Sequence, residues 1–202
     1  IMDQFACACG QLDRLLFLDC RTLEWQTLPL PDDIAIVVAD TTIRRSLMSG
    51  AYNQRRQDCE EALRILRIDL PGIKALRDVS LAEFNRLAHK LPERVQKRAR
   101  HVVGEIERSY DAVSLLKSRR IARFGQLLYE CHTSLRDLYE VSIPELDTMV
   151  NLAQSIEGCW GARLTGAGFG GCTVNLVSGS QVEKFVKTLL TDVSGGVVPG
   201  DV

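Results

Sequence analysis

The sequence predicts an α+β fold, and three observations support this class. Apolar residues recur every three or four positions over long stretches, which is typical of amphipathic helices. Short apolar runs bounded by glycine, proline or aspartate occur toward both ends of the chain, which is typical of strands. The two patterns do not alternate regularly, as they would in a doubly wound α/β protein. We therefore expect blocks of helix and blocks of strand within the 202 residues.

The composition is that of an ordinary soluble globular protein. The formal net charge is −1, so nothing indicates nucleic acid or an anionic membrane as a partner. The longest apolar run, residues 34–39, is too short to span a bilayer, and no signal peptide is visible. The seven cysteines contain no C-x-x-C pair, so we expect buried thiols in a reducing cytoplasm. We interpret the basic cluster at Lys97, Arg98, Arg100 and His101 as a solvated helix face.

The first part of the chain is predicted to form a short helix and three strands. Residues 2–9 favour a helix that ends at Gly10. Residues 15–18 and 23–28 have the composition of two strands. Residues 34–39 are continuously apolar, which indicates a strand buried on both faces.

From about residue 50 the pattern becomes helical. Capping boxes at residues 80–83 and 142–145 mark the expected starts of two helices. Between them, apolar stripes over residues 102–113 and 121–138 predict two long helices that face the core. Neither stripe needs a ligand to explain it.

The last part of the chain returns to strands. Residues 162–165 and 172–177 are predicted strands on either side of the glycine-rich stretch 166–171. Residues 180–183 are expected to open one more helix. A further strand is expected after residue 197, where the chain cuts it short.

Two single residues are candidates for chemistry, and each is weak alone. Asp3 lies near a predicted helix start, where free N–H groups stabilise a carboxylate, but an ordinary first-turn aspartate explains it as well. Tyr52 lies at the mouth of another helix, where its hydroxyl and ring are suited to a sugar. A partly buried tyrosine on an amphipathic helix is the plainer explanation.

The third candidate is the glycine-rich stretch, with four glycines in six residues. These are Gly166, Gly168, Gly170 and Gly171. Such a density permits close backbone approach to a ligand, and exposed N–H groups can cradle phosphate oxygens. A tight turn between strands is the alternative. The spacing matches neither a Walker A loop nor a dinucleotide fingerprint.

Taken in order, these stretches resemble the galactokinase family of the GHMP sugar-kinase superfamily. The matching segments are 1–4 (IMDQ), 18–21 (LDCR), 51–56 (AYNQRR), 136–142 (RDLYEVS) and 165–172 (TGAGFGGC). The resemblance covers nearly the whole chain in register. It implies a GHMP-kinase-like fold, with residues 1–48 as the end of the N-terminal kinase domain. Residues 49–202 would then be most of an α/β-sandwich C-terminal domain.

The resemblance also implies an activity. Galactokinases transfer the γ-phosphoryl group of ATP, with Mg²⁺, to the anomeric hydroxyl of galactose. Asp3 is then the catalytic base at that hydroxyl and a sugar contact, Tyr52 contacts galactose, and the four glycines support the bound phosphates. A carboxylate within hydrogen-bond reach can accept the hydroxyl proton, and positioning supplies most of the rest. A monomeric, cytoplasmic parent with galactose and ATP as its small-molecule partners is implied as well.

Parts of the family pattern are absent from the chain. The N-terminal galactose-binding motif, the serine-rich phosphate loop and the magnesium-ligand glutamate have no counterpart, so we expect an inactive fragment of a longer enzyme. Three alternatives stay open: a kinase for N-acetylgalactosamine or arabinose, a non-catalytic galactokinase-like sugar sensor, and a structural module left by truncation. The stretches 1–5 and 51–53 favour galactose among the sugars.

Overall fold

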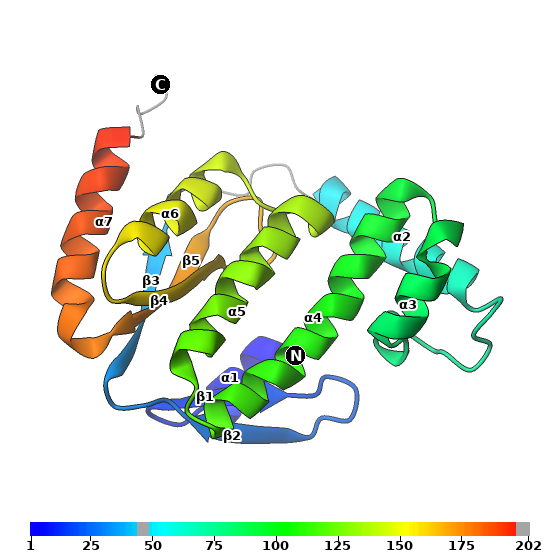
Figure 1. Cartoon of the computed structure of the whole chain (residues 1–202), viewed down its shortest axis with the longest axis horizontal. Helices are drawn as coiled ribbons and strands as arrows, with labels where there is room; N and C mark the ends of the chain where they lie inside the picture. Colours follow the sequence, from blue (N-terminus) through cyan, green and yellow to red (C-terminus); the bar gives the residue numbers. More distant parts are fainter. Residues whose placement is uncertain (44–48, 197–202) are drawn as a thin grey trace.

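The fold combines a β-hairpin, a three-stranded sheet and two groups of helices (Figure 1). It is described here for residues 1–43 and 49–196 of a computed structural model. The helices and strands, in chain order, are α1 (Met2–Cys9), β1 (Arg14–Leu18), β2 (Trp25–Pro29), β3 (Ile34–Asp40), α2 (Ser49–Leu66), α3 (Leu81–Leu87), α4 (Glu93–Lys117), α5 (Ile121–Ser134), α6 (Pro144–Ser155), β4 (Cys159–Leu164), β5 (Cys172–Ser178) and α7 (Val182–Gly196). Short 3₁₀ helices are η1 (Leu76–Asp78), η2 (Ala88–Lys90) and η4 (Gly179–Gln181), and η3 (Leu135–Tyr139) is a short π-helix. The predicted α+β class is confirmed. The strand expected after residue 197 lies outside the described residues.

Strands β1 and β2 form an antiparallel hairpin, as the two predicted strands suggested. The register pairs Arg14 with Pro29 and Leu18 with Trp25. The predicted helix α1 precedes the hairpin, and the N–H of Gly10 caps it by donating to the carbonyl of Ala6. Gly10 is in an extended conformation, so the helix ends without a left-handed cap.

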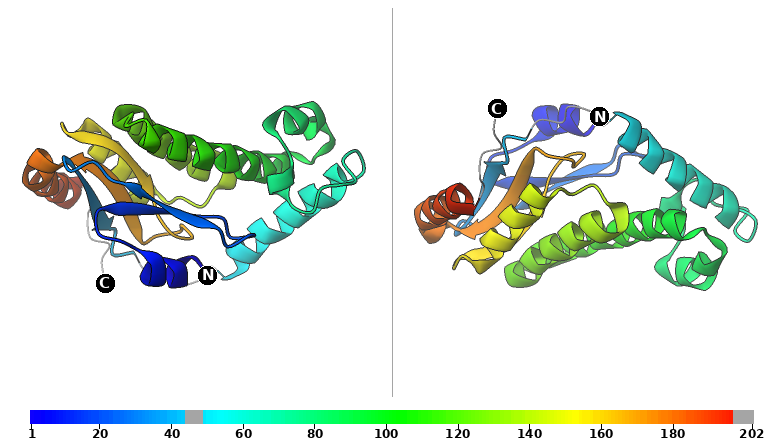
Figure 2. Two further views of the ribbon diagram at one scale, coloured as in Figure 1. Left: turned by 90° about the horizontal axis from the view of Figure 1, so that it is seen from below. Right: turned by 90° about the horizontal axis from the view of Figure 1, so that it is seen from above.

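The second sheet has the strand order β3-β5-β4, and both pairings are antiparallel. Helices α6 and α7 pack on one face of it, and α5 packs against the edge strand β4 (Figure 2). Helix α5 approaches β4 very closely, because a Cβ atom at Gly161 would lie 2.1 Å from the carbonyl oxygen of Gly125. Glycine is therefore required where this helix crosses the strand.

The prediction that residues 34–39 are buried on both faces is wrong. Burial alternates along β3, and the side chains of Ile36 and Val38 are 42% and 62% exposed. The hairpin covers Ile34 and Leu176 at one end of this outer face, while α6 and α7 cover the opposite face. An apolar run reports the character of both faces, but it does not say that an element covers each of them.

The helices from α2 to α4 share a core of their own. Helices α2, α3 and α4 enclose Leu66, Phe84 and Val95, which are almost completely buried. The capping box at residues 80–83 is confirmed, because Ser80 accepts the N–H of Glu83 and donates its own N–H to the Glu83 carboxylate. None of the described helices is long and apolar enough to cross a membrane.

Two local predictions in this region are wrong. Ser142 does not cap α6, which begins at Pro144 with Ile143 as its N-cap. Ser142 instead donates to the carboxylate of Asp147. The basic cluster is not a solvated face, since Arg98 and His101 are 2% and 6% exposed.

The cysteines differ in burial more than expected. Cys131 is buried and Cys7 and Cys20 are exposed. The other four are partly buried. The expectation of buried thiols is therefore met fully by Cys131 and wrong for the two exposed residues.

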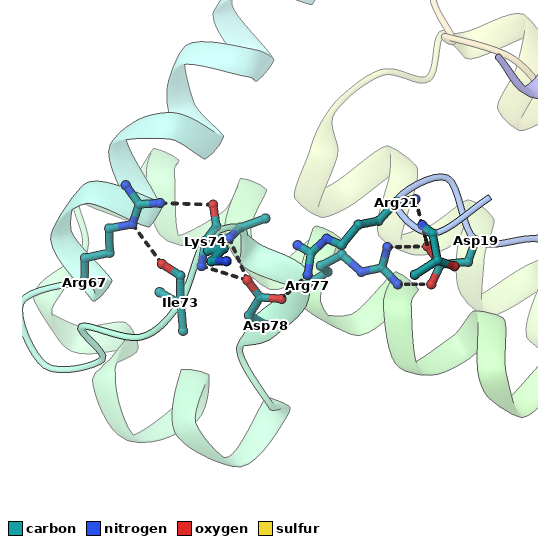
Figure 3. A network of polar contacts seen from close by, with 9 residues as sticks. Asp19, Arg21, Arg67, Ile73, Lys74, Arg77 and Asp78 are labelled. Carbon is teal, nitrogen blue, oxygen red and sulfur yellow. Dashed lines mark hydrogen bonds and ion pairs between the residues drawn. The ribbon is translucent and has the colours of Figure 1, made fainter. Parts of the chain in front are cut away.

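The hairpin loop is bound to the turn η1 by two crossed ion pairs (Figure 3). Arg77 donates to both carboxylate oxygens of Asp19, at 2.8 and 2.5 Å, and Arg21 donates to Asp78 at 2.6 Å. The Arg77 guanidinium holds the pKa of Asp19 well below its usual range. Asp19 and Arg21 belong to a segment that resembles the family, and here they fasten the hairpin to the helical region.

These contacts cross residue 48, where a boundary between two domains is predicted. Strand β3, which precedes residue 48, completes its sheet with β4 and β5, which follow it. The hairpin loop is likewise joined to η1 beyond that residue. The division into residues 1–48 and 49–202 stays a prediction.

Candidate active site

The glycine-rich stretch forms a loop between β4 and β5. Its glycines have positive φ angles of 79°, 80°, 115° and 84° at Gly166, Gly168, Gly170 and Gly171, and Phe169 has φ 62°. Residues with a side chain rarely adopt such angles, so the shape of the loop favours glycine at these positions. The N–H of Thr165 donates to the carbonyl of Cys172 and closes the loop at 2.9 Å.

The loop is fixed to the rest of the fold on two sides. The N–H of Phe169 donates to the carbonyl of Val141 at 2.7 Å. The N–H of Gly171 donates to the carbonyl of Ile43, and the N–H of Thr41 donates to the carbonyl of Gly171. Among the described residues, the N–H groups of Gly166, Ala167, Gly168 and Gly170 have no partner. These four are the donors that the loop can still offer to an anion.

Helix α2 brings Tyr52 toward the same loop. Arg55, one turn after Tyr52 on the same helix face, has its guanidinium carbon 5.9 Å from the centre of the Phe169 ring. The Tyr52 side chain is 60% exposed, so its hydroxyl is accessible to a ligand. Burial raises the pKa of Tyr139 to about 12, and the nearby Tyr52 hydroxyl contributes to the same direction. Helix α2 thus contacts both the carbonyl of Tyr139 and the ring of Phe169 through Arg55.

Asp3 lies elsewhere in the structure. It occupies the first turn of α1 and is exposed. Helix α1 packs beside β1. No hydrogen bond or ion pair joins Asp3 to another residue in the described part of the chain. Helix α2, which carries Tyr52, therefore contacts the glycine loop through Arg55, and within the described residues no side-chain contact joins Asp3 to Tyr52 or to the loop.

Sequence reasoning missed a histidine that supports the start of the loop. His132, on α5, accepts the N–H of Leu164 at Nδ1, so its proton resides on Nε2, which lies 3.1 Å from Asp147. Ser142 donates to the same carboxylate. Burial lowers the pKa of His132, which favours the neutral ring that these hydrogen bonds indicate. A polar residue inside the apolar stripe of α5 was the available signal.

Two further arginines were also missed. Arg55 donates to the carbonyls of Tyr139 and Glu140, and the buried Arg98 donates to Leu138 and Glu140. Their carbonyl partners belong to η3 and the residue that follows it, which lead directly to Val141. The basic sequence 97–101 gave no sign that one of its members is a core residue.

A cavity of about 340 Å³ lies between the hairpin and helices α4 and α5. Its lining is mostly apolar and includes Leu15, Phe17, Leu116 and Phe124. None of its lining residues belongs to the glycine loop or to α2, so we do not include it in the candidate site.

Comparison with known proteins identifies the chain. A profile described as "GHMP kinases C terminal" matches residues 112–192. The chain is 51% identical to a galactokinase of Roseiflexus sp. (strain RS-1), over 92% of this chain and 47% of that protein. It is 46% identical to a galactokinase of Chloroflexus aggregans, over 94% of this chain and 49% of that protein. The chain belongs to the galactokinase family of GHMP kinases. It spans about half the length of the curated relatives it matches.

Solved structures agree with this family assignment. The galactokinase of Lactococcus lactis, crystallised with galactose, superposes with a TM-score of 0.90 at 37% identity, covering 96% of this chain and 50% of that one. A mevalonate kinase of L. major matches with a TM-score of 0.51 at 22% identity, covering 89% of this chain and 45% of that one, which shows the fold alone. The predicted GHMP-kinase-like fold is confirmed.

Proposed function

We propose that the full-length protein containing this chain is a galactokinase. It transfers the γ-phosphoryl group of ATP to the anomeric hydroxyl of galactose and acts as a monomer in the cytoplasm. One observation carries the proposal: the chain resembles galactokinases over more than nine-tenths of its length, including a structure determined with galactose. The chain spans about half of each relative, so the activity is proposed for the whole protein.

The candidate residues take different roles in this reaction. Asp3 is the base that accepts the proton of the sugar hydroxyl as the new phosphorus–oxygen bond forms. Tyr52 contacts galactose through its accessible hydroxyl. The unpartnered N–H groups of Gly166, Gly168 and Gly170 face the phosphate side, where oriented amides stabilise negative charge without reorganising.

Mg²⁺ supplies charge neutralisation on the transferred phosphates when it is bound. Within residues 1–43 and 49–196, no group of three or more histidine, cysteine, aspartate or glutamate side chains is placed to hold a metal. No magnesium ligand is assigned to these residues.

The direct test is the reaction itself, measured on the full-length protein. ADP release is followed with ATP and Mg²⁺ in the presence of galactose, N-acetylgalactosamine, arabinose or no sugar. We expect galactose to give the highest kcat/KM and chelation of the metal to abolish turnover. A higher kcat/KM for another sugar would reassign the substrate. Tight galactose binding without turnover would identify a sensor instead.

A further inference from the structure

Three successive carbonyl groups after α5 are held by two arginines from different helices. Arg98 on α4 donates to the carbonyl of Leu138, and Arg55 on α2 donates to the carbonyls of Tyr139 and Glu140, at 2.6 and 2.7 Å. The last carbonyls of a helix have no partner within the helix. Here side chains from α2 and α4 satisfy them, so both helices fix the path of the chain at this turn.

The turn held in this way is strained and leads into the glycine loop. Glu140 has a left-handed conformation, with φ 52° and ψ 55°, which is disfavoured for a residue with a side chain. Arg98 also binds the Glu140 carboxylate at 2.5 Å, so it holds this residue's side chain as well as the carbonyl before it. The next residue, Val141, receives the N–H of Phe169. The position of the turn therefore sets the position of the loop.

The core ion pair that Arg98 forms with Asp58 is a loose one. Asp58 on α2 is 1% exposed, and its Oδ2 lies 3.8 Å from the Nε of Arg98. Neither of these two atoms has a hydrogen-bond partner among the described residues. The other nitrogens of the guanidinium are directed at the turn instead. Burying a cation is costly. We therefore infer the role of Arg98 from its closest contacts, which are the Leu138 carbonyl and the Glu140 carboxylate.

We propose that Arg98 is a positioning residue for the glycine loop, acting through Glu140 and Val141. Its effect on phosphoryl transfer rests on the proposed function, whereas its effect on the loop does not. A guanidinium is required because it binds a carbonyl and a carboxylate at once in a fixed fork, which an ammonium group cannot reproduce.

The chain offers a matched control one turn away on the same helix. Arg94 binds the same Asp58 carboxylate at 3.2 Å, but its side chain is 60% exposed and it has no contact with the turn. Arg98→Met and Arg94→Met therefore both remove an arginine from Asp58, and Arg98→Met alone also releases the turn. Both are made in the full-length protein, with Arg98→Lys as a third variant that keeps a charge beside Asp58.

Two measurements are made on each folded variant. Amide hydrogen exchange is followed in peptides covering residues 165–172, and kcat and KM are measured with galactose and ATP. For Arg98→Met we expect faster amide exchange in the loop. We also expect a fall in kcat of about ten- to a hundredfold, with smaller changes in KM, because a displaced loop slows phosphoryl transfer. Arg94→Met is expected to match the wild type in both measurements.

Loop exchange in Arg98→Met equal to that in Arg94→Met would overturn the proposal. If Arg98→Met does not fold, Arg98→Lys decides the question, and wild-type loop exchange in that variant would overturn it equally. If the wild-type protein has no galactokinase activity, the proposed function fails, but the exchange measurement still tests the role of Arg98.

Discussion

The backbone N–H of Phe169 donates to the carbonyl of Val141 over 2.7 Å, and this bond ties the glycine loop to the turn that follows α5. Both partners have unusual surroundings. Phe169 has a positive φ angle, and Val141 follows a left-handed glutamate. The glycine-rich loop, which resembles the family over residues 165–172, is thus held in a defined shape by a distant part of the chain.

Gly168 is the loop position that we expect to be least tolerant of substitution. A Cβ atom there would lie 2.2 Å from the Val141 carbonyl oxygen, and φ is 80°. Gly168→Ala and Gly168→Val should therefore displace the loop and lower kcat of the full-length enzyme, while a thermal melt reports whether the fold survives. Gly72→Ala is the control, because a Cβ atom at Gly72 meets nothing within 4 Å. A folded, fully active Gly168→Val enzyme would show that the loop only connects two strands and has no role in the reaction.

Asp3→Asn tests the proposed base in the full-length enzyme. Loss of a general base lowers kcat by about 10²–10⁴. The exposed carboxylate has no hydrogen bond within the described residues, so the melting temperature should not change. Asp32→Asn, another exposed aspartate, serves as the control. Wild-type kcat in Asp3→Asn would refute the assignment.

Tyr52→Phe removes a hydroxyl while retaining the ring. If that hydroxyl binds the sugar, its loss costs about 0.5–1.5 kcal/mol, which raises KM for galactose a few-fold. KM for ATP is the internal control and should stay near the wild-type value. An increase confined to ATP would contradict the role in sugar binding.

His101 makes the stability of the fold depend on pH. Its ring lies 2.8 Å from the Ser134 hydroxyl and stacks on Tyr139, and burial lowers its pKa to about 4. In the unfolded chain the pKa is about 6.5. Between these values the unfolded state binds a proton that the folded state does not, so stability is complete above about pH 6.5 and is lost as pH falls toward about 4. The loss is ~3 kcal/mol for this pKa difference.

The measurement is the free energy of unfolding in denaturant, repeated from pH 7 to pH 4.5. We expect His101→Gln to flatten the dependence without removing it, because burial also lowers the pKa of His132. His89→Gln, at an exposed position, is the control. Equal slopes in His101→Gln and the wild type would show that His101 is not the cause.

The 202-residue chain alone is expected to be helical, self-associating and inactive. The apolar helix cores supply its circular dichroism signal, and the exposed Ile36 and Val38 on edge strand β3 favour association. Val38→Lys should therefore shift sedimentation toward the monomer. We expect no galactose-dependent ATP consumption, since the sequence contains no serine-rich phosphate loop. Turnover by this chain would contradict that account.

The sequence was sufficient for most elements of secondary structure. Periodicity located the helices and the strands, because apolar spacing is set locally by the geometry of each element. It could not show which basic residues are buried. Arg98 and Arg94 are one turn apart on α4, yet Arg98 is buried and contacts residues 138–140, while the side chain of Arg94 is exposed.

The candidate site shows the same limit. The glycine spacing indicated an unusual loop, but its attachment to Val141 and Ile43 depends on segments far away in the chain. Ser142 was predicted to cap α6 because its spacing fits, whereas the nearby Asp147 carboxylate takes its hydroxyl. Competition between partners of this kind is decided by packing in three dimensions.

The pairing of β3 with β5 has a consequence for how the protein is made. Asp40 lies opposite Cys172, so β3 emerges from the ribosome long before its partner strand exists. At about 5–20 residues per second, the interval is roughly ten seconds. Helices α2 to α5 are translated during this time, and their largely local contacts can form first. A nascent chain that stalls before residue 172 would therefore present an unpaired strand to chaperones or to other nascent chains.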